Sequence, residues 1–155
     1  MGPIEPRGAG AMQVSDILKA KGTRVLTVRP EEAVSTFIKR IKLEKVGAMV
    51  VSADGIRPEG LITERDIVHG LAQHGAELLA MQVREVMTQR VLTCAPSESI
   101  KDVMIKMTRG RTRHLPVMEG GRLAGMISIG DVVKSRLENA ELEANVLRDY
   151  ITTAR

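Results

Sequence analysis

The chain contains one seven-residue pattern twice, as Gly60-Leu61-Ile62-Thr63-Glu64-Arg65-Asp66 and as Gly125-Met126-Ile127-Ser128-Ile129-Gly130-Asp131. Each copy has a glycine, two apolar residues, a hydroxyl residue and, three positions after the hydroxyl, an aspartate. A short apolar run predicts a buried strand, and Ser or Thr three residues before an acid predicts the start of a helix. The sequence therefore predicts the same strand-to-helix junction at two places.

The repeat extends well beyond these two heptapeptides. Other matching stretches are Arg24–Thr27 with Arg90–Thr93, Pro30 with Pro96, Gly55 with Gly121, and Val14–Leu18 with Val83–Met87. The offset between the copies changes by about one residue near Ile56 and by about three near 19–22, as expected where gaps fall in loops. Two copies indicate a paired domain and not an open solenoid.

Each half is predicted to have the order β-α-β-β-α, which makes the fold class α/β (α+β). The first half has predicted strands at 24–29, 48–51 and 60–62, with helices at 30–45 and 63–73. The second half has predicted strands at 91–94, 115–118 and 123–127, with helices at 97–108 and from 129 onward. We expect a flexible leader at 1–11, the first repeat at 12–75, a linking helix (76–87) and second repeat within 76–136, and a helical tail at 137–155.

Composition limits the classes of function. The 155 residues include one Phe, one Tyr and no Trp, so the chain lacks the aromatic platforms that stack single-stranded nucleic acid. One cysteine, Cys94, cannot form an internal disulfide, and no Cys/His spacing predicts a metal site. No signal peptide or membrane span is predicted, so we expect a cytoplasmic protein. Halves of this size bury too little surface alone, so they are predicted to pack as a pseudo-twofold pair.

The Ser/Thr-x-x-Asp pattern places a hydroxyl and a carboxylate at the start of a helix. Unpaired N–H groups and the helix dipole favour phosphate there. A carboxylate one turn later can accept hydrogen bonds from both hydroxyls of a ribose. The purely structural alternative is a capping box, which uses the same residue types. Two copies in equivalent repeats, each after an apolar strand, favour a nucleotide site.

The segment from about Val14 to Leu137 resembles a tandem pair of cystathionine-β-synthase-type domains, the CBS pair. The resemblance rests on the two heptapeptides, on the strands GAMVV and HLPVM before them, and on the openings RVLTVRPEEAV and RVLTCAPSESI. It implies a stand-alone, non-catalytic regulatory module of bacterial type. Such a module binds AMP, ADP, ATP, S-adenosylmethionine or NAD between the halves and acts as an energy sensor. The resemblance also implies a homodimer and an unknown regulated protein.

The resemblance also assigns roles to residues. Asp66 and Asp131 would hold ribose hydroxyls. Phosphate would lie beside Thr63, Arg65, Ser128, Arg113 and His114. Adenine would contact two groups of residues, largely through backbone: Thr23, Arg24, Val25, Gln89, Arg90 and Val91 at the opening strands, and Gly47, Ala48, Met49, Leu115 and Pro116 in the adjoining wall.

The two predicted sites are not equivalent. The second repeat has an arginine-rich stretch, 109–114, where the first repeat has 43–48, and the first has Arg65 where the second has Gly130. Since arginine forms charge-assisted bonds with phosphate, we expect the second site to prefer more negative ligands. A solvated loop is the alternative for this arginine cluster.

Two further functions compete with the sensor. The net charge of +4 suggests a basic nucleic-acid-binding protein, although no recognition helix is evident. An enzyme would need a nucleophile–base pair, a metal cluster or a phosphate loop, and the sequence shows none of these. The apolar residues of the tail leave two alternatives open, covering its own core or forming a dimer contact.

Overall fold

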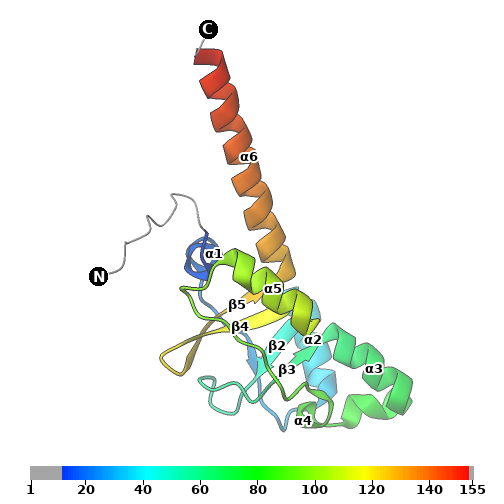
Figure 1. The fold of residues 1–155 in the computed structure, drawn as a ribbon. Coiled ribbons are helices and arrows are strands. Elements are labelled where there is room, and N and C mark those ends of the chain that lie inside the picture. Colours follow the sequence, from blue (N-terminus) through cyan, green and yellow to red (C-terminus); the bar gives the residue numbers. More distant parts are fainter. Residues whose placement is uncertain (1–11, 154–155) are drawn as a thin grey trace.

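A computed structural model describes residues 12–153, and it shows two halves of matching architecture (Figure 1). The predicted leader at 1–11 lies outside the described residues. The first half contains β1 (Thr27–Val28), α2 (Val34–Glu44), β2 (Ala48–Val51), β3 (Gly60–Thr63) and α3 (Glu64–His74). The second half contains α5 (Ile100–Gly110), β4 (His114–Glu119), β5 (Arg122–Ser128) and α6 (Ile129–Thr153). Helix α1 (Val14–Lys21) precedes the first half, and the 3-10 helix η1 (Gly75–Ala80) and helix α4 (Val83–Val86) precede the second. The mixed α/β fold is confirmed.

The two sheets are small. The first has the order β1-β2-β3, with β1 parallel and β3 antiparallel to β2. The second consists of the antiparallel pair β4 and β5, with a register shift between Val117 and Met118. The predicted strand at 91–94 is wrong, because only Cys94 pairs, as an isolated parallel bridge to Val117. The segment before Cys94 starts at the other sheet, where Thr88 bridges to Leu61, so it crosses between the halves and cannot follow one strand.

The two halves exchange the helices that precede them in the sequence. Helix α1 packs on the second half, where the N–H of Val14 donates to the carbonyl of Glu98 at 2.9 Å. Helix α4 packs on the first half, where the N–H of Val83 donates to the carbonyl of Glu32 at 2.8 Å. The chain therefore crosses twice between the halves, which joins them into one pseudo-symmetric unit.

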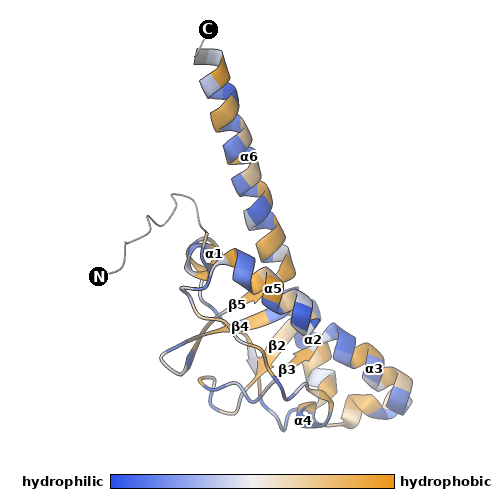
Figure 2. Cartoon of the chain, viewed as in Figure 1, coloured by the Kyte–Doolittle hydropathy of each residue, from blue (hydrophilic) through white to orange (hydrophobic). Residues whose placement is uncertain are grey.

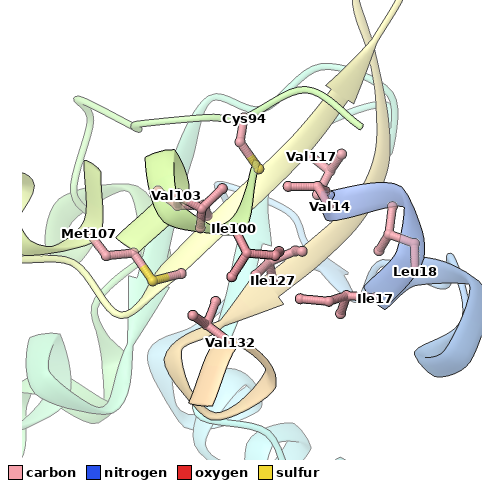
Figure 3. Packing of buried hydrophobic residues seen from close by; sticks show 11 residues of the cluster. Val14, Ile17, Leu18, Cys94, Ile100, Val103, Met107, Val117, Ile127 and Val132 are labelled. Atoms are coloured by element: carbon pink, nitrogen blue, oxygen red, sulfur yellow. The ribbon is translucent and has the colours of Figure 1, made fainter. Parts of the chain in front are cut away.

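Alternate residues of the strands face two different apolar regions. In β2, Met49 and Val51 lie in the core of the first half, whereas Ala48 and Val50 lie in the cluster between the halves. The core of the second half includes residues of α1, as Figure 3 shows. The cluster between the halves comprises Ala48, Val50 and Leu61, packed against Val25, Val91, Leu123 and Met126. Burial of these side chains drives association of the halves.

The linking segment differs from its prediction, whereas the tail is helical as predicted. A single linking helix at 76–87 is wrong, because η1 ends and Met81 adopts an extended conformation before α4. The tail is one continuous helix that projects from the body (Figure 1). Its first turns bury Val132 and Ser135, but Leu137 is 60% exposed, so the alternative that the tail covers its own core is wrong for the projecting turns. No helix within residues 12–153 has the length and apolarity needed to cross a membrane.

Candidate functional site

The first heptapeptide forms a strand-to-helix junction held by reciprocal hydrogen bonds. Thr63 caps α3, and its backbone N–H donates to Oδ2 of Asp66 at 2.9 Å. The N–H of Asp66 donates back to Oγ1 of Thr63 at 3.3 Å. The Thr63 hydroxyl also lies 3.2 Å from the same carboxylate oxygen. The junction is thus a capping box, and Oδ1 of Asp66 remains directed to other partners.

The second heptapeptide repeats this geometry. The N–H of Ser128 donates to Oδ2 of Asp131 at 2.9 Å, and the N–H of Asp131 donates to Oγ of Ser128 at 3.2 Å. In the described part of the chain, Oδ1 of Asp131 accepts no hydrogen bond. Capping does not exhaust either carboxylate, because each can accept about four hydrogen bonds. The capping box and the ribose-binding hypothesis are therefore compatible.

A third Ser-x-x-Asp sequence shows what the motif does without such a strand. Ser99 caps α5 and accepts a hydrogen bond from the N–H of Asp102 at 3.1 Å. No strand precedes it, and Asp102 is exposed on the outside of the second half. The motif alone therefore stabilises a helix start, and the strand before it distinguishes the two heptapeptides.

Each junction faces a segment that enters the opposite half. Thr88, which follows α4, pairs with Leu61 of β3 through its backbone, and its hydroxyl lies 3.5 Å from Oδ1 of Asp66. At the other junction, Nζ of Lys21 donates to the carbonyl of Met126 at 2.9 Å and to Oδ2 of Asp131 at 2.7 Å. Asp66 therefore lies at the start of segment 88–91, and Asp131 lies at the start of segment 21–25. Each candidate site is built from both halves.

The glycines of the heptapeptides permit these close approaches. A Cβ atom at Gly60 would lie 2.5 Å from Sδ of Met87 and 2.9 Å from the carbonyl oxygen of Thr88. At Gly125 it would lie 2.6 Å from Cδ2 of Leu18. At Gly60 the contact includes backbone, so only glycine fits without a shift of the chain, whereas at Gly125 the end of the Leu18 side chain would have to move.

His114 lies where the two halves meet. A Cβ atom at Gly47 would be 3.6 Å from Cε1 and Nε2 of His114, and 3.9 Å from the carboxyl carbon of Glu64. Burial lowers the pKa of His114, and the nearby charge of Lys21 adds to this effect. Asp131 and Glu64 oppose it without reversing it. The imidazole is thus neutral at pH 7 and sits within reach of charged groups from both repeats.

Ion pairs distinguish the cations of the two sites. Burial raises the pKa of Asp131, but the hydrogen bond and charge of Lys21, with the N–H of Ser128, outweigh burial and lower it overall. Arg24, beside this site, lies 3.9 Å from Glu44. Within residues 12–153, neither Arg65 nor Arg90, which belong to the Asp66 side, forms an ion pair. Over the same range Arg113, whose carbonyl accepts a hydrogen bond from the N–H of Ile129 at the Asp131 junction, forms no ion pair either. Arginines without an ion pair therefore lie beside both junctions, and the preference of the second site for more negative ligands stays a prediction.

The remaining predicted residues occupy two environments. Thr23, Gln89 and Arg113 are exposed, Arg24 and Arg90 extend into solvent, and Val25 and Val91 line the cluster between the halves. Ala48 and Pro116 are buried near the start of their strands. The side chains of Met49 and Leu115 are fully buried in the cores of their own halves, so only their backbone can face a ligand. The contacts of all these residues with a ligand stay a prediction.

A hollow of about 270 Å³ reaches Asp131 from between α1 and α6. Its wall includes Asp16, Lys21, Lys134 and Glu138, so it is rich in charge. The volume lies just below the range of roughly 300–1,000 Å³ usual for ligand pockets. Lys21 and Asp131 both line this hollow, and the hydrogen bond between them occupies one oxygen of the carboxylate. Within the described residues, no cluster of His, Cys, Asp and Glu could hold a metal ion.

Sequence reasoning did not identify Lys21, Thr88 or Glu64 as site residues. The sequence did mark Lys21 as unusual. It lies among the roughly three residues, near 19–22, that the first copy has and the second copy lacks. The insertion extends α1 by a turn, which carries Lys21 to β5. Thr88 and Glu64 carry no comparable mark, since their positions depend on the crossing of the chain between halves.

Comparison with known proteins places this architecture in a family. The family model described as CBS domain matches residues 14–73 and again 83–138. The CBS domain-containing protein CBSX3, mitochondrial, of Arabidopsis thaliana is 31% identical over 156 residues, which cover 96% of this chain and 76% of that protein. The crystal structure of the CBS-domain containing protein ATU1752 from Agrobacterium tumefaciens is 44% identical, with a TM-score of 0.79 over 83% of this chain and 96% of that one. The CBS domain pair of protein MJ0100, in complex with 5′-methylthioadenosine and S-adenosyl-L-methionine, is 25% identical, with a TM-score of 0.72 over 84% of this chain and 98% of that one.

Proposed function

The chain belongs to the CBS domain family as a tandem pair, and from this premise we propose that it is a non-catalytic regulatory module for adenosine-containing ligands. Asp66 and Asp131 would each bind the ribose of one ligand through the carboxylate oxygen that capping leaves available. The MJ0100 pair, whose structure contains two adenosine compounds, supports this ligand class. The single observation that carries the proposal is the pair of matching Ser/Thr–Asp junctions at the seam between the halves.

The composite construction of each site provides a mechanism for signalling. A ligand at Asp66 would touch the first half through α3 and the second through segment 88–91, and a ligand at Asp131 would touch β5 and segment 21–25. Such a ligand favours the relative orientation of the halves in which it can contact both halves at once. It shifts the population only as far as its affinities for the two orientations differ. A regulated protein would then recognise the changed surface.

We propose that the two sites differ in ligand preference. Within residues 12–153, Arg65 and Arg90 form no ion pair, and no lysine contacts the Asp66 carboxylate, so phosphorylated ligands such as AMP, ATP or NAD can bind there without displacing a cation. At Asp131 the ammonium of Lys21 already occupies the carboxylate, so a ribose must displace or share it. A ligand with its own positive charge, such as S-adenosylmethionine, gains nothing from Lys21. Once a ribose has displaced the ammonium from Asp131, that ammonium can bind the phosphate of a phosphorylated ligand.

Calorimetric titration with adenosine, AMP, ATP, NADH and S-adenosylmethionine tests the proposal. We expect two sites for at least one ligand. The Asp66→Asn and Asp131→Asn variants should each lose one site or weaken it by about tenfold to a hundredfold, the value of hydrogen bonds to a charged group. Asparagine can still accept the capping hydrogen bond, so the helix start should survive.

Asp102→Asn is the matched control, because Asp102 has the same position after a helix cap but faces outward. It should bind like the wild type. The proposal fails if none of the five compounds binds the folded protein, or if Asp102→Asn weakens binding as much as the other two variants. Release of product from any of these compounds by the purified protein would contradict the non-catalytic assignment.

A further inference from the structure

The projecting part of α6 carries apolar side chains that the described chain does not cover. Figure 2 shows hydrophobic residues recurring along the helix far beyond the body. One set recurs at alternating intervals of four and three residues, and we name this set the α6 seam: Val133, Leu137, Ala140, Ala144, Leu147 and Ile151. Leu137, Leu147 and Ile151 are about 60% exposed, so the seam is unpartnered over most of its length.

This spacing is the heptad pattern of a coiled coil. Residues that alternate by four and three stay on one side of a helix, and two such helices supercoil to bury them. The two central alanines let the partner helix approach closely. A second copy of this chain supplies a matching seam without any further protein, since a twofold interface uses the same surface on both partners.

Charged residues beside the seam select the orientation of the two helices. On one flank lie Arg136 and Glu143, and on the other Glu141 and Arg148. In a parallel pair, the residue on the first flank faces the residue five positions later on the partner's second flank. Arg136 would then face Glu141 of the other copy, and Glu143 would face Arg148, so all four contacts are attractive.

An antiparallel pair reverses this result. In that arrangement each flank of one helix faces the same flank of the other helix. A pair centred near residue 142 would therefore bring Glu141 against Glu141 and Glu143 against Glu143. Within residues 12–153 none of the four charged residues forms an ion pair inside its own chain. Their charges are therefore available to a partner, and they favour the parallel arrangement.

We propose that the α6 seam forms a parallel, in-register two-helix coiled coil with a second copy of the chain. The interface places both bodies at the same end of the coil. It involves neither heptapeptide, and the inference does not depend on the nucleotide function.

Two neighbouring residues of α6, one inside and one outside the α6 seam, provide a matched test. Leu147 is 61% exposed and belongs to the seam, whereas Val146 is 59% exposed and lies outside it. Sedimentation equilibrium should show a dimer for the wild type and for Val146→Glu. Leu147→Glu should weaken the dimer at least about tenfold, because it places two charges in a buried seam. Circular dichroism and thermal unfolding should show that both variants keep the folded body. A monomeric wild type at tens of micromolar, or equal effects of the two substitutions, would overturn the interface.

Cysteine substitutions test the orientation. In a parallel, in-register pair, Leu137→Cys and Ala144→Cys should each form a disulfide with the same residue of the other copy under mild oxidation. An antiparallel pair can bring only one of these two positions against itself. The native Cys94 should not interfere, because it is buried and burial raises the pKa of its thiol to about 11. Cross-linking of only one variant, or of neither, would overturn the parallel arrangement.

Charge reversal gives an independent measure of the same arrangement. Arg136→Glu should weaken the dimer roughly fivefold at low salt, since it replaces two attractive contacts with repulsive ones. Adding Glu141→Arg to this variant should restore the wild-type dissociation constant. Failure of the second substitution to restore association would contradict the predicted pairing of 136 with 141.

Discussion

Nζ of Lys21 lies 2.7 Å from Oδ2 of Asp131, and it blocks part of the carboxylate that the family resemblance assigns to a ribose. In the other half, Thr88 takes the corresponding place and brings only a hydroxyl, 3.5 Å from Oδ1 of Asp66. Lys21 even bonds to the carbonyl of Met126, as the N–H of Thr88 does to that of Leu61. Equivalent carbonyls, those of Leu61 and Met126, thus accept from a backbone N–H in one site and from an ammonium in the other, and of the two site carboxylates in the described chain only that of Asp131 carries a lysine.

Lys21→Ala should separate the structural from the ligand-related role of this ion pair. Both side chains are partly exposed, so we expect a loss of less than about 1 kcal/mol in the free energy of unfolding at pH 7. The loss should disappear in acid, because the lowered pKa of Asp131 contributes stability only above the pH at which that carboxylate is protonated. Removing the ammonium also frees the carboxylate, so adenosine should bind more tightly at the Asp131 site. Urea denaturation across pH and calorimetric titration measure the two effects.

Lys19→Ala is the control for this prediction. Lys19 lies in the same last turn of α1 and is exposed, but it forms no ion pair in the described part of the chain. It should leave both adenosine affinity and stability close to those of the wild type. Equal adenosine binding by both variants would show that Lys21 does not limit access to Asp131.

Gly60→Ala should be more damaging than Gly125→Ala. A methyl group at residue 60 meets the backbone carbonyl of Thr88 as well as Met87, whereas at residue 125 it meets the end of the Leu18 side chain. A side chain can rotate away, but the backbone must move, so we expect Gly60→Ala to cost about 1–3 kcal/mol and Gly125→Ala less. Because Thr88 faces Asp66, only the first substitution should also weaken ligand binding at that site. Chemical denaturation of the two variants side by side checks the order, and a larger cost for Gly125→Ala would contradict it.

The backbone role of the two aspartates predicts a difference between amide and alanine substitutions. Asp66→Ala removes an acceptor for the N–H of Thr63, which should cost about 1 kcal/mol of stability, as the loss of a helix cap typically does. Asp66→Asn keeps an acceptor oxygen and should cost less, although both variants lose the charge proposed to bind ribose. Thermal unfolding should therefore rank the alanine variant below the asparagine variant, while titration ranks them together. Equal stability of the two variants would show that the cap contributes little.

The sequence predicted the repeat, the fold class and the starts of α3 and α6 because these depend on local patterns. Helices α2 and α5 begin at Val34 and Ile100, after the predicted starts at 30 and 97. Apolar runs mark β2 and β3, and the Ser/Thr-x-x-Asp spacing marks the first turn of α3. The strand at 91–94 and the helix at 76–87 failed because their conformations depend on the crossing between halves. Thr88 must reach Leu61 before Cys94 reaches Val117, and no local periodicity records that path.

The ends of two helices show the same limit. Lys45 and Arg111 occupy equivalent positions after α2 and α5, and both adopt left-handed backbone, with φ of 55° and 49°. Glycine usually takes this position, so its absence gave no signal for the helix ends. Likewise, the candidate aspartates were evident from spacing, but the ion pair of Lys21 with Asp131 joins residues far apart in the sequence. This ion pair could be found only in three dimensions.

His114 predicts a pH dependence that distinguishes phosphorylated from unphosphorylated ligands. Burial and then Lys21 hold the pKa of its imidazole below the ordinary value of 6.5, so it is neutral in the free protein at pH 7. A phosphate beside it would favour the protonated form, and binding would then take up a proton. Affinity for AMP should therefore rise from pH 8 toward pH 6 more in the wild type than in His114→Gln, whereas adenosine affinity should change little in either.

The same shift predicts the direction of a stability change. Between the lowered pKa of the folded state and 6.5, the unfolded chain binds more protons at this residue than the folded chain does. The free energy of unfolding should therefore fall as the pH drops below 6.5, and His114→Gln should remove that part of the decline. His69→Gln is the control, because His69 is exposed on α3, whereas His114 is partly buried beside Gly47. The contrary result is that AMP affinity changes with pH in the same way in the wild type and in His114→Gln, while their stabilities still differ. That result would show that His114 stabilises the contact between the halves but does not touch the phosphate.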